Sequence, residues 1–190
     1  MQPKLSLLAL ALALAALPSL FAQTPAQNTP QPAENLVAQL DSMRLQWEAA
    51  LPSLATQTAE RGDEYHTDKV FAHYFSEVSP DKMAVLRNEL SSGGSRTENR
   101  FYLQAGKVFC WSLYREDKSD SPRARKRLTH YYCENGVVFH VSEKSVPAQE
   151  SLDSQVFTTV SIADPKSMTE FMNRKFQHLL DAFQKVNSGN

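Results

Sequence analysis

The side chains best suited to acid–base or metal chemistry gather in one short stretch, GDEYHTD, which holds Asp63, Glu64, His66 and Asp68. Carboxylates and imidazoles are metal ligands and general acids or bases, so these four are the candidates for a metal-dependent or other hydrolase site. No spacing such as HExxH places them on one face of a helix. Solvated charge in a link between helices is therefore the favoured interpretation, and no metal or other cofactor is expected.

The two cysteines, Cys110 and Cys133, are predicted to form a disulfide. They lie in two similar units 30 residues apart, FYLQAGKVFCWS and YYCENGVVFHVS, each typical of a strand, a tight turn and a strand. Two-residue turns at Ala105-Gly106 and Asn135-Gly136, with symmetric pairing of the hairpins, place the cysteines opposite each other. Such a bridge would contribute about 3 kcal/mol. The alternative, a reactive or metal-binding pair, fits less well because the spacing matches neither CxxC nor a zinc pattern.

His130 and His140 flank the second turn, and strand alternation predicts that they lie on opposite faces, too far apart to share a metal. No GxSxG turn is present for a serine nucleophile, and the stretch SSGGS lacks the lysine of a phosphate-binding loop. The sequence therefore contains no positive evidence for catalysis.

A basic cluster lies in the link between the two hairpins, EDKSDSPRARKR, and consists of Arg123, Arg125, Lys126 and Arg127. One interpretation is a contact for an anionic partner such as lipid headgroups or a polysaccharide, and another is a protease-sensitive loop tip. The favoured interpretation is a solvated loop, because nearby aspartates offset much of the positive charge.

The elements that must position these residues begin with a helix from about Glu34, since apolar residues recur there at steps of three and four. Pro52 should kink this helix and Gly62 should end it. The segment 67–78 is ambiguous, because its aromatic and β-branched residues suit a strand as well as a helix, and helix is favoured. The segment SPDKMAVLRNEL is predicted to be a further helix, with Ser79 as its cap and Pro80 at its first position.

The C-terminal half is predicted to be mainly strand. The two hairpins form a four-stranded meander, and alternation from Val156 to Ile162 adds a fifth strand. Asp164 then caps a long amphipathic helix that packs on the sheet. The predicted fold class is therefore α+β, an antiparallel β-meander of about five strands (two tandem hairpins plus one further strand) packed against N-terminal helices and a long C-terminal helix.

Repeated aromatic residues should line the inner face of this sheet, under the helices. If both turns are two-residue loops, Tyr102 lies opposite Phe109 and Tyr132 opposite Phe139. The predicted inner face consists of Tyr102, Phe109, Trp111, Leu113, Tyr132, Phe139 and Val141. An open aromatic platform for sugars or bases is the alternative, but alternating aromatics on a sheet usually belong to the core.

The N-terminus is that of an exported protein. Residues 1–22 are typical of a signal peptide, with Lys4 before an apolar run that closes on Ala22. Residues 23–33 are a predicted flexible leader, and residues 34–187 a single α+β domain. The product is expected to be secreted or periplasmic, with no transmembrane segment after signal removal. A retained membrane anchor is the alternative, but Pro18 interrupts the end of the run.

Charge excludes one class of partner. The chain has 20 basic and 21 acidic residues, and loss of Lys4 with the signal leaves 19 against 21, a net charge of −2. Binding to nucleic acid needs an excess of basic residues, so it is not expected. The favoured function is an exported, soluble, non-enzymatic module that binds a protein or a cell-envelope component. A hydrolase using the region from Asp63 to Asp68 and a structural envelope protein are the alternatives.

Overall fold

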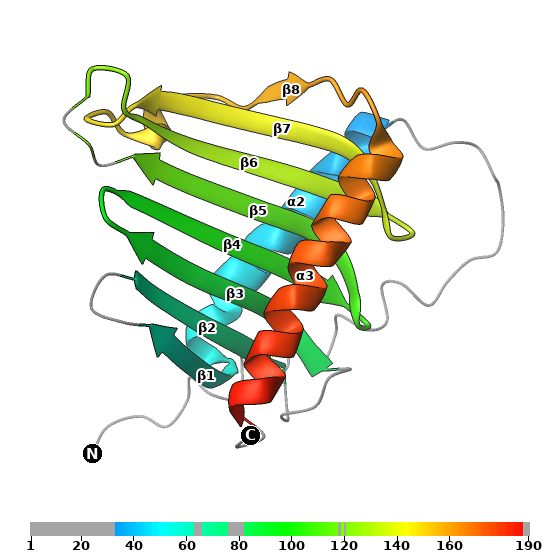
Figure 1. Ribbon diagram of the computed structural model, residues 1–190. Helices are drawn as coiled ribbons and strands as arrows, with labels where there is room; N and C mark the ends of the chain where they lie inside the picture. The colour runs from blue at the N-terminus through cyan, green and yellow to red at the C-terminus, as the bar shows by residue number, and fades with distance from the viewer. Residues whose placement is uncertain (1–32, 63–65, 76–81, 118, 120, 188–190) are drawn as a thin grey trace, which may run out of the picture. The chain divides into compact units, whose positions relative to one another are not determined.

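Eight antiparallel strands, hydrogen-bonded in chain order, form one sheet with a helix on each face (Figure 1). The computed structural model describes residues 33–62, 66–75, 82–117, 119 and 121–187. The predicted signal peptide lies outside these residues, as does the predicted leader except for Ala33, which begins the first described helix. Neither helix formed by the described residues has the length and apolar character needed to cross a membrane.

The elements follow one another as helix, sheet and helix. Their bounds are α2 Ala33–Ala50, η2 Leu51–Ser53, β1 Ala55–Gly62, β2 His66–Tyr74, β3 Met83–Ser92, β4 Ser95–Gln104, β5 Lys107–Asp117, β6 Arg125–Glu134, β7 Val137–Pro147, η4 Leu152–Ser154, β8 Thr158–Val160 and α3 Pro165–Asn187. The predicted helix from about Glu34 and the predicted C-terminal helix are both present, as α2 and α3. The first ends just before Pro52, and the last is capped by Asp164, whose Oδ1 accepts from the Ser167 N–H at 3.1 Å.

The predicted fold class is wrong, because the sheet has eight strands rather than about five and only one helix precedes it among the described residues. The segments predicted to be the second and third helices are strands β2 and β3, and the end of the first predicted helix is strand β1.

These strands resemble helices in sequence because helices cover both faces of the sheet. Val70 packs on the α3 side, its neighbour Phe71 faces the other side, and Met83–Leu86 are buried in succession. Period-two alternation is thereby lost.

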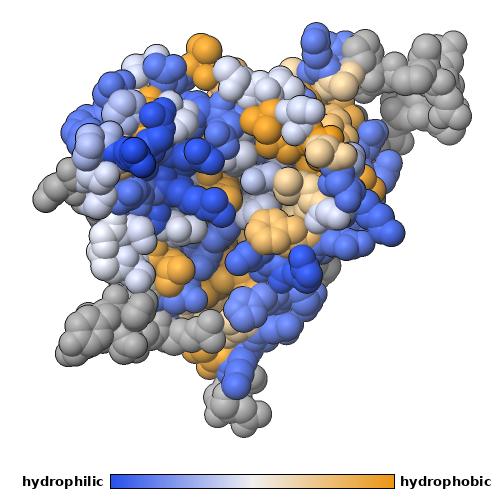
Figure 2. Space-filling model, turned by 45° about the horizontal axis from the view of Figure 1, so that its top comes forward, coloured by the Kyte–Doolittle hydropathy of each residue, from blue (hydrophilic) through white to orange (hydrophobic). Residues whose placement is uncertain are grey.

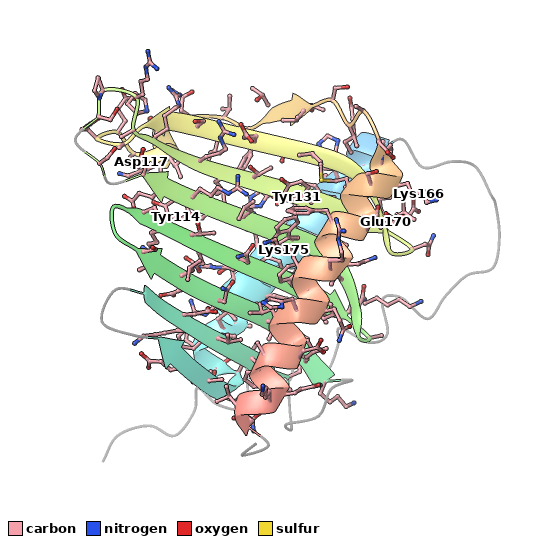
Figure 3. All side chains as sticks on the ribbon, in the orientation of Figure 1. Tyr114, Asp117, Tyr131, Lys166, Glu170 and Lys175 are labelled. Carbon is pink, nitrogen blue, oxygen red and sulfur yellow. The ribbon has the colours of Figure 1, made fainter. Side chains whose placement is uncertain are left out.

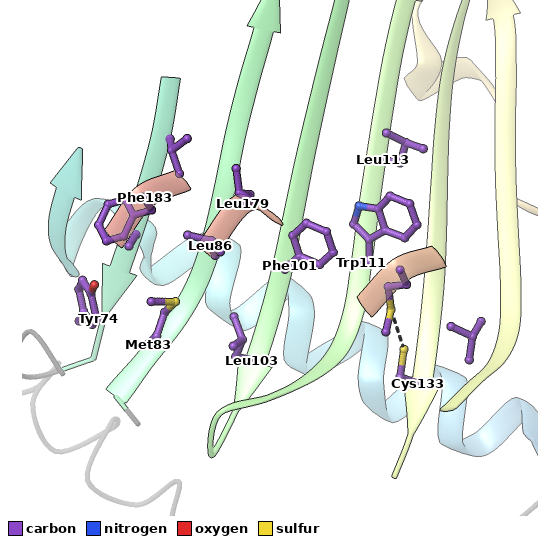
Figure 4. Close-up of a cluster of buried hydrophobic side chains, with 14 of the residues drawn as sticks. Tyr74, Met83, Leu86, Phe101, Leu103, Trp111, Leu113, Cys133, Leu179 and Phe183 are labelled. Atoms are coloured by element: carbon purple, nitrogen blue, oxygen red, sulfur yellow. Dashed lines mark hydrogen bonds between the residues drawn. The ribbon is translucent and has the colours of Figure 1, made fainter. Parts of the chain in front are cut away.

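Two apolar clusters lie on opposite faces of the sheet. The larger packs under α3 and includes Phe101, Trp111 and Leu113 from the sheet with Met172, Leu179 and Phe183 from the helix (Figure 4). The smaller packs under α2 around Trp47 and includes Tyr102, Phe109 and Tyr132. The predicted inner face is therefore wrong as a single face, because the aromatic residues expected together divide between the two clusters.

Both hairpin turns are confirmed, and each is followed by a β-bulge that explains this division. Positive φ angles at Ala105 (49°), Gly106 (74°), Asn135 (52°) and Gly136 (80°) are those that a type I′ turn requires. Beyond the turns, Phe109 and Phe139 are the extra residues, so Tyr102 pairs with Cys110 and Tyr132 with His140. One inserted residue reverses the face of everything beyond it. The predicted Tyr102–Phe109 and Tyr132–Phe139 pairs are therefore wrong.

The predicted disulfide is not formed, and both cysteines are free and buried. Because of the register, Cys110 pairs with Tyr132 rather than with Cys133. Cys110 belongs to the cluster under α2 and Cys133 to the cluster under α3, where its thiol contacts Met172 Sδ at 3.4 Å (Figure 4). A bridge through the sheet between opposite faces is not compatible with disulfide geometry.

Both thiols are expected to resist alkylation in the folded protein. Burial raises the pKa of both, that of Cys133 to about 12, so neither forms the reactive thiolate at neutral pH. Mass spectrometry after treatment with N-ethylmaleimide should show no adduct on the native protein. The same sample unfolded in guanidinium without reductant should show two. An unfolded, unreduced sample that takes up no adduct would contradict the register.

Candidate functional site

The structure describes only part of the predicted site in the GDEYHTD stretch, so this prediction stays untested. Asp63 and Glu64 lie outside the described residues, and the side chain of His66, at the start of β2, is outside them as well. Asp68 is described, and its Oδ1 accepts from Asn88 Nδ2 at 3.0 Å. Within the described part of the chain, no three histidine, cysteine, aspartate or glutamate side chains form a group that could bind a metal.

The basic cluster is divided between a loop and the two faces of the sheet. Arg123 is exposed in the loop before β6, whereas Arg125, Lys126 and Arg127 alternate along β6. Their charges are engaged locally: Arg125 Nε donates to Ser145 Oγ at 2.9 Å, Lys126 pairs with Glu116 at 3.9 Å, and Arg127 pairs with Glu143 at 3.4 Å. Arg125 and Arg127 therefore lie on one face of β6 and Lys126 on the other, and contact with an anionic partner stays a prediction.

The two histidines near the second turn lie on the same face, contrary to prediction. His130 and Tyr132 share the face of β6 toward α2, and Tyr132 pairs directly with His140 across the bulge. The ring centroids of Tyr132 and His140 are 5.8 Å apart. Phe139 is the extra residue that brings His140 to this face.

A cavity of about 300 Å³ lies on the same side of the sheet, between α2 and strands β4 to β6. We call it the helix–sheet cavity. Most of the residues that line it have polar or charged side chains: they are Arg44, Glu48, Arg96, Glu98, Arg100, Tyr102, Ser112, Tyr114, Leu128 and His130. Tyr114 is labelled in Figure 3, near the end of β5 that leads to Asp117. Residues from a helix and three strands thus converge on one small volume.

Arg44 supplies hydrogen-bond donors that the protein does not use. Its Nε donates to Asp41 Oδ1 at 2.8 Å, which holds the guanidinium in place. Its two terminal nitrogens have no hydrogen-bond partner among the described residues, although only 12% of the side chain is exposed. Burial alone would lower the pKa of Arg44, but the hydrogen bond to Asp41 raises it above its ordinary value. A permanently charged fork therefore lies at the wall of the cavity.

A buried serine–histidine pair forms part of the cavity floor. Ser112 Oγ and His130 Nδ1 are 2.7 Å apart, and 3% of His130 is exposed. Burial and the nearby charge of Arg44 lower the pKa of His130 to about 3, so its ring is neutral at pH 7. If Ser112 donates to Nδ1, Nε2 carries the proton and can donate in turn. His130 Nε2 has no hydrogen-bond partner in the part of the chain that the structure describes.

The acidic residues of the cavity are held by hydrogen bonds. Glu48 accepts from Arg100 Nη1 at 2.8 and 2.7 Å and also from the hydroxyl of Tyr102. Burial and the charge of Glu48 raise the pKa of Tyr102, so its hydroxyl remains a donor. Glu98 accepts from Arg96 at 3.3 Å and from Arg100. These carboxylates are therefore satisfied and do not compete for Arg44.

A second cavity, of about 490 Å³, lies on the other face, beside β8 and the start of α3. Its lining is mainly apolar and includes Tyr131, which lies beside α3 in Figure 3. Its two acidic residues accept hydrogen bonds from neighbours, Glu143 from Thr129 and Asp164 from Ser167.

Figure 2, in which the top of Figure 1 comes forward, shows a surface of mostly hydrophilic residues with several separate hydrophobic patches. We therefore take the helix–sheet cavity as the candidate site.

The residues of this cavity were not predicted from the sequence as a site. One local signal was present, since Arg96, Glu98 and Arg100 alternate along β4 as charges do on one face of a strand. Arg44 and Glu48 are four residues apart on one face of α2, but only the docking of this helix brings them to the sheet. Compared with known proteins, the chain matches no family model, no curated protein and no solved structure.

Proposed function

We propose that the protein is an exported, non-enzymatic binding module that holds a small polar ligand in the helix–sheet cavity. The observation that carries the proposal is the pair of terminal nitrogens on Arg44, which are charged donors without a partner among the described residues. Leaving charged donors unsatisfied beside a cavity is costly unless water or a ligand occupies it. The apolar run at the N-terminus supports export.

Hydrolysis is less well supported, although a serine and a histidine are in contact. A general base works best with a pKa near the operating pH, and that of His130 lies near 3. A third group should orient the histidine, but the hydrogen bonds of a neighbouring carboxylate, Asp41, go to Arg44 and Tyr132. The pair therefore supports binding better than nucleophilic attack.

The test is to map binding of small polar fragments by two-dimensional NMR of the folded protein. We expect fragments to shift the backbone amides of Arg100, Ser112 and His130 in the sheet and that of Arg44 in α2. Arg44→Gln should abolish these shifts, because it removes the charged donors. Arg115→Gln is the matched control, since Arg115 is an exposed arginine on β5 outside the cavity. Shifts confined to the cavity beside α3 would contradict the proposal.

A further inference from the structure

The charges of the helix–sheet cavity restrict the ligand to few charges. Three arginines line it, and three carboxylates lie against them: Asp41 pairs with Arg44, Glu48 with Arg100 and Glu98 with Arg96. The cluster is therefore neutral overall, and Glu48 and Glu98 themselves line the cavity. A ligand with two negative charges would be repelled by these carboxylates, whereas a single charge can be compensated by Arg44.

The free donors of the cavity match one chemical group. The Nε of Arg44 donates to Asp41, so the two terminal nitrogens are the donors that remain for a ligand. Two parallel donors on a planar guanidinium match the two oxygens of a carboxylate. The neutral ring of His130 provides a third donor at Nε2 when Ser112 donates to Nδ1. A carboxylate satisfies these donors without an added cation.

The cavity also has a flat, partly apolar wall. Tyr114 and Leu128 pair directly across β5 and β6 on the cavity side of the sheet. An aromatic ring beside an aliphatic side chain suits a flat or apolar ligand body. The recognised group and the body of the ligand would therefore lie on different parts of the lining.

We propose that the helix–sheet cavity is selective for a small monocarboxylate, whose oxygens accept from the terminal nitrogens of Arg44 and whose body lies against Tyr114 and Leu128. This inference rests on the proposed function, because it names the ligand class of the same site. It excludes the dianionic phosphates and the neutral amides of the same shape as preferred ligands.

The test compares three probes of similar shape by NMR titration of the full mature chain: benzoate, its neutral isostere benzamide, and phenyl phosphate at pH 7.5. We expect benzoate to bind in the cavity about tenfold more tightly than either of the others, the effect of one charge-assisted contact. Arg44→Lys keeps the charge but removes the fork, so it should weaken benzoate binding about tenfold. Arg115→Gln should leave all three affinities unchanged.

The outcomes separate the inference from the proposed function. Benzamide or phenyl phosphate binding in the cavity as tightly as benzoate would overturn selectivity for carboxylates and leave a binding cavity. If benzoate does not bind there but other polar fragments do, selectivity for carboxylates is also wrong and the binding cavity stands. If no fragment of any charge shifts the cavity amides, the inference and the proposed function are both wrong. Full benzoate affinity in Arg44→Lys would overturn the role assigned to the fork.

Discussion

Lowering the pH from 7 to 5 is expected to reduce the free energy of unfolding by about 4 kcal/mol, because His73 and His130 are buried without charge. Burial and nearby arginines lower the pKa of His73 to about 4 and that of His130 to about 3, from 6.5. Below pH 6.5 the unfolded chain takes up protons that the folded chain excludes. The contribution of the two histidines to the free energy of unfolding is therefore fully present above about pH 6.5. At pH 5 it is smaller by about 2 kcal/mol per histidine.

The surroundings of the two histidines give the physical reason. Thr56 Oγ1 lies 2.9 Å from Nδ1 of His73, and Nε2 of His73 is buried with no hydrogen-bond partner among the described residues. A protonated His73 would carry an unpaired charge there, close to Arg87 and Arg100. His130 is similarly enclosed beside Arg44.

Urea unfolding curves at pH 7 and pH 5 measure the effect. His130→Gln and His73→Gln should each remove about half of the pH dependence, whatever they do to stability at pH 7. His178→Gln is the control, because His178 is exposed on α3 and its replacement should leave the pH dependence unchanged. Equal free energies of unfolding at the two pH values in the wild-type protein would show that the histidines are not buried as described.

Trp47→Ala is expected to destabilise the protein by about 3–5 kcal/mol and to release α2 from the sheet. Trp47 is the buried residue of α2, and its ring lies edge-on to Phe75 and Phe109, with centroids 4.9 and 4.8 Å away. The other attachments of α2 are the partly buried Val37, Leu40 and Met43 and a hydrogen bond in which Asp41 Oδ1 accepts from the Tyr132 hydroxyl at 2.7 Å. A helix of 18 residues has little stability of its own in water, so it depends on this anchor.

Hydrogen exchange together with urea unfolding tests this prediction. The amides of α2 should lose protection in Trp47→Ala while those of α3 keep theirs, since α3 packs on the opposite face. Leu45→Ala is the control on the same helix, because Leu45 is 53% exposed and should cost less than about 0.5 kcal/mol. Equal effects of the two substitutions would contradict the docking of α2 through Trp47.

The fold was predictable where local chemistry decides the conformation. Asn135-Gly136 and Ala105-Gly106 adopt the predicted turns because positive φ is required there. Asp164 and Pro165 begin α3 as predicted, since a side-chain acceptor and a fixed φ favour a helix start. Strands β2 and β3 were missed because each buries both of its faces, which yields the same apolar content as a buried helix.

The site was not predictable from local patterns, and the two bulges show why. Phe109 and Phe139 follow their turns by the same interval, yet nothing in their residue types marks an extra position in the strand. The extra residue Phe139 brings His140 to the face of His130. The β5–β6 register, which pairs Cys110 with Tyr132, places Cys110 and Cys133 on opposite faces. Pairing across strands, rather than the sequence of either strand, sets this register.

The sequence by itself determined the two hairpin turns, the cap at Asp164 and the presence of the two helices, because each depends on neighbours within a few residues. Only the tertiary structure decided which face each strand residue occupies and that Arg44 meets Ser112 and His130 at one cavity. The physical reason is that a sheet covered on both sides removes the alternation that would mark its faces. Contacts between distant segments then decide where every polar group lies.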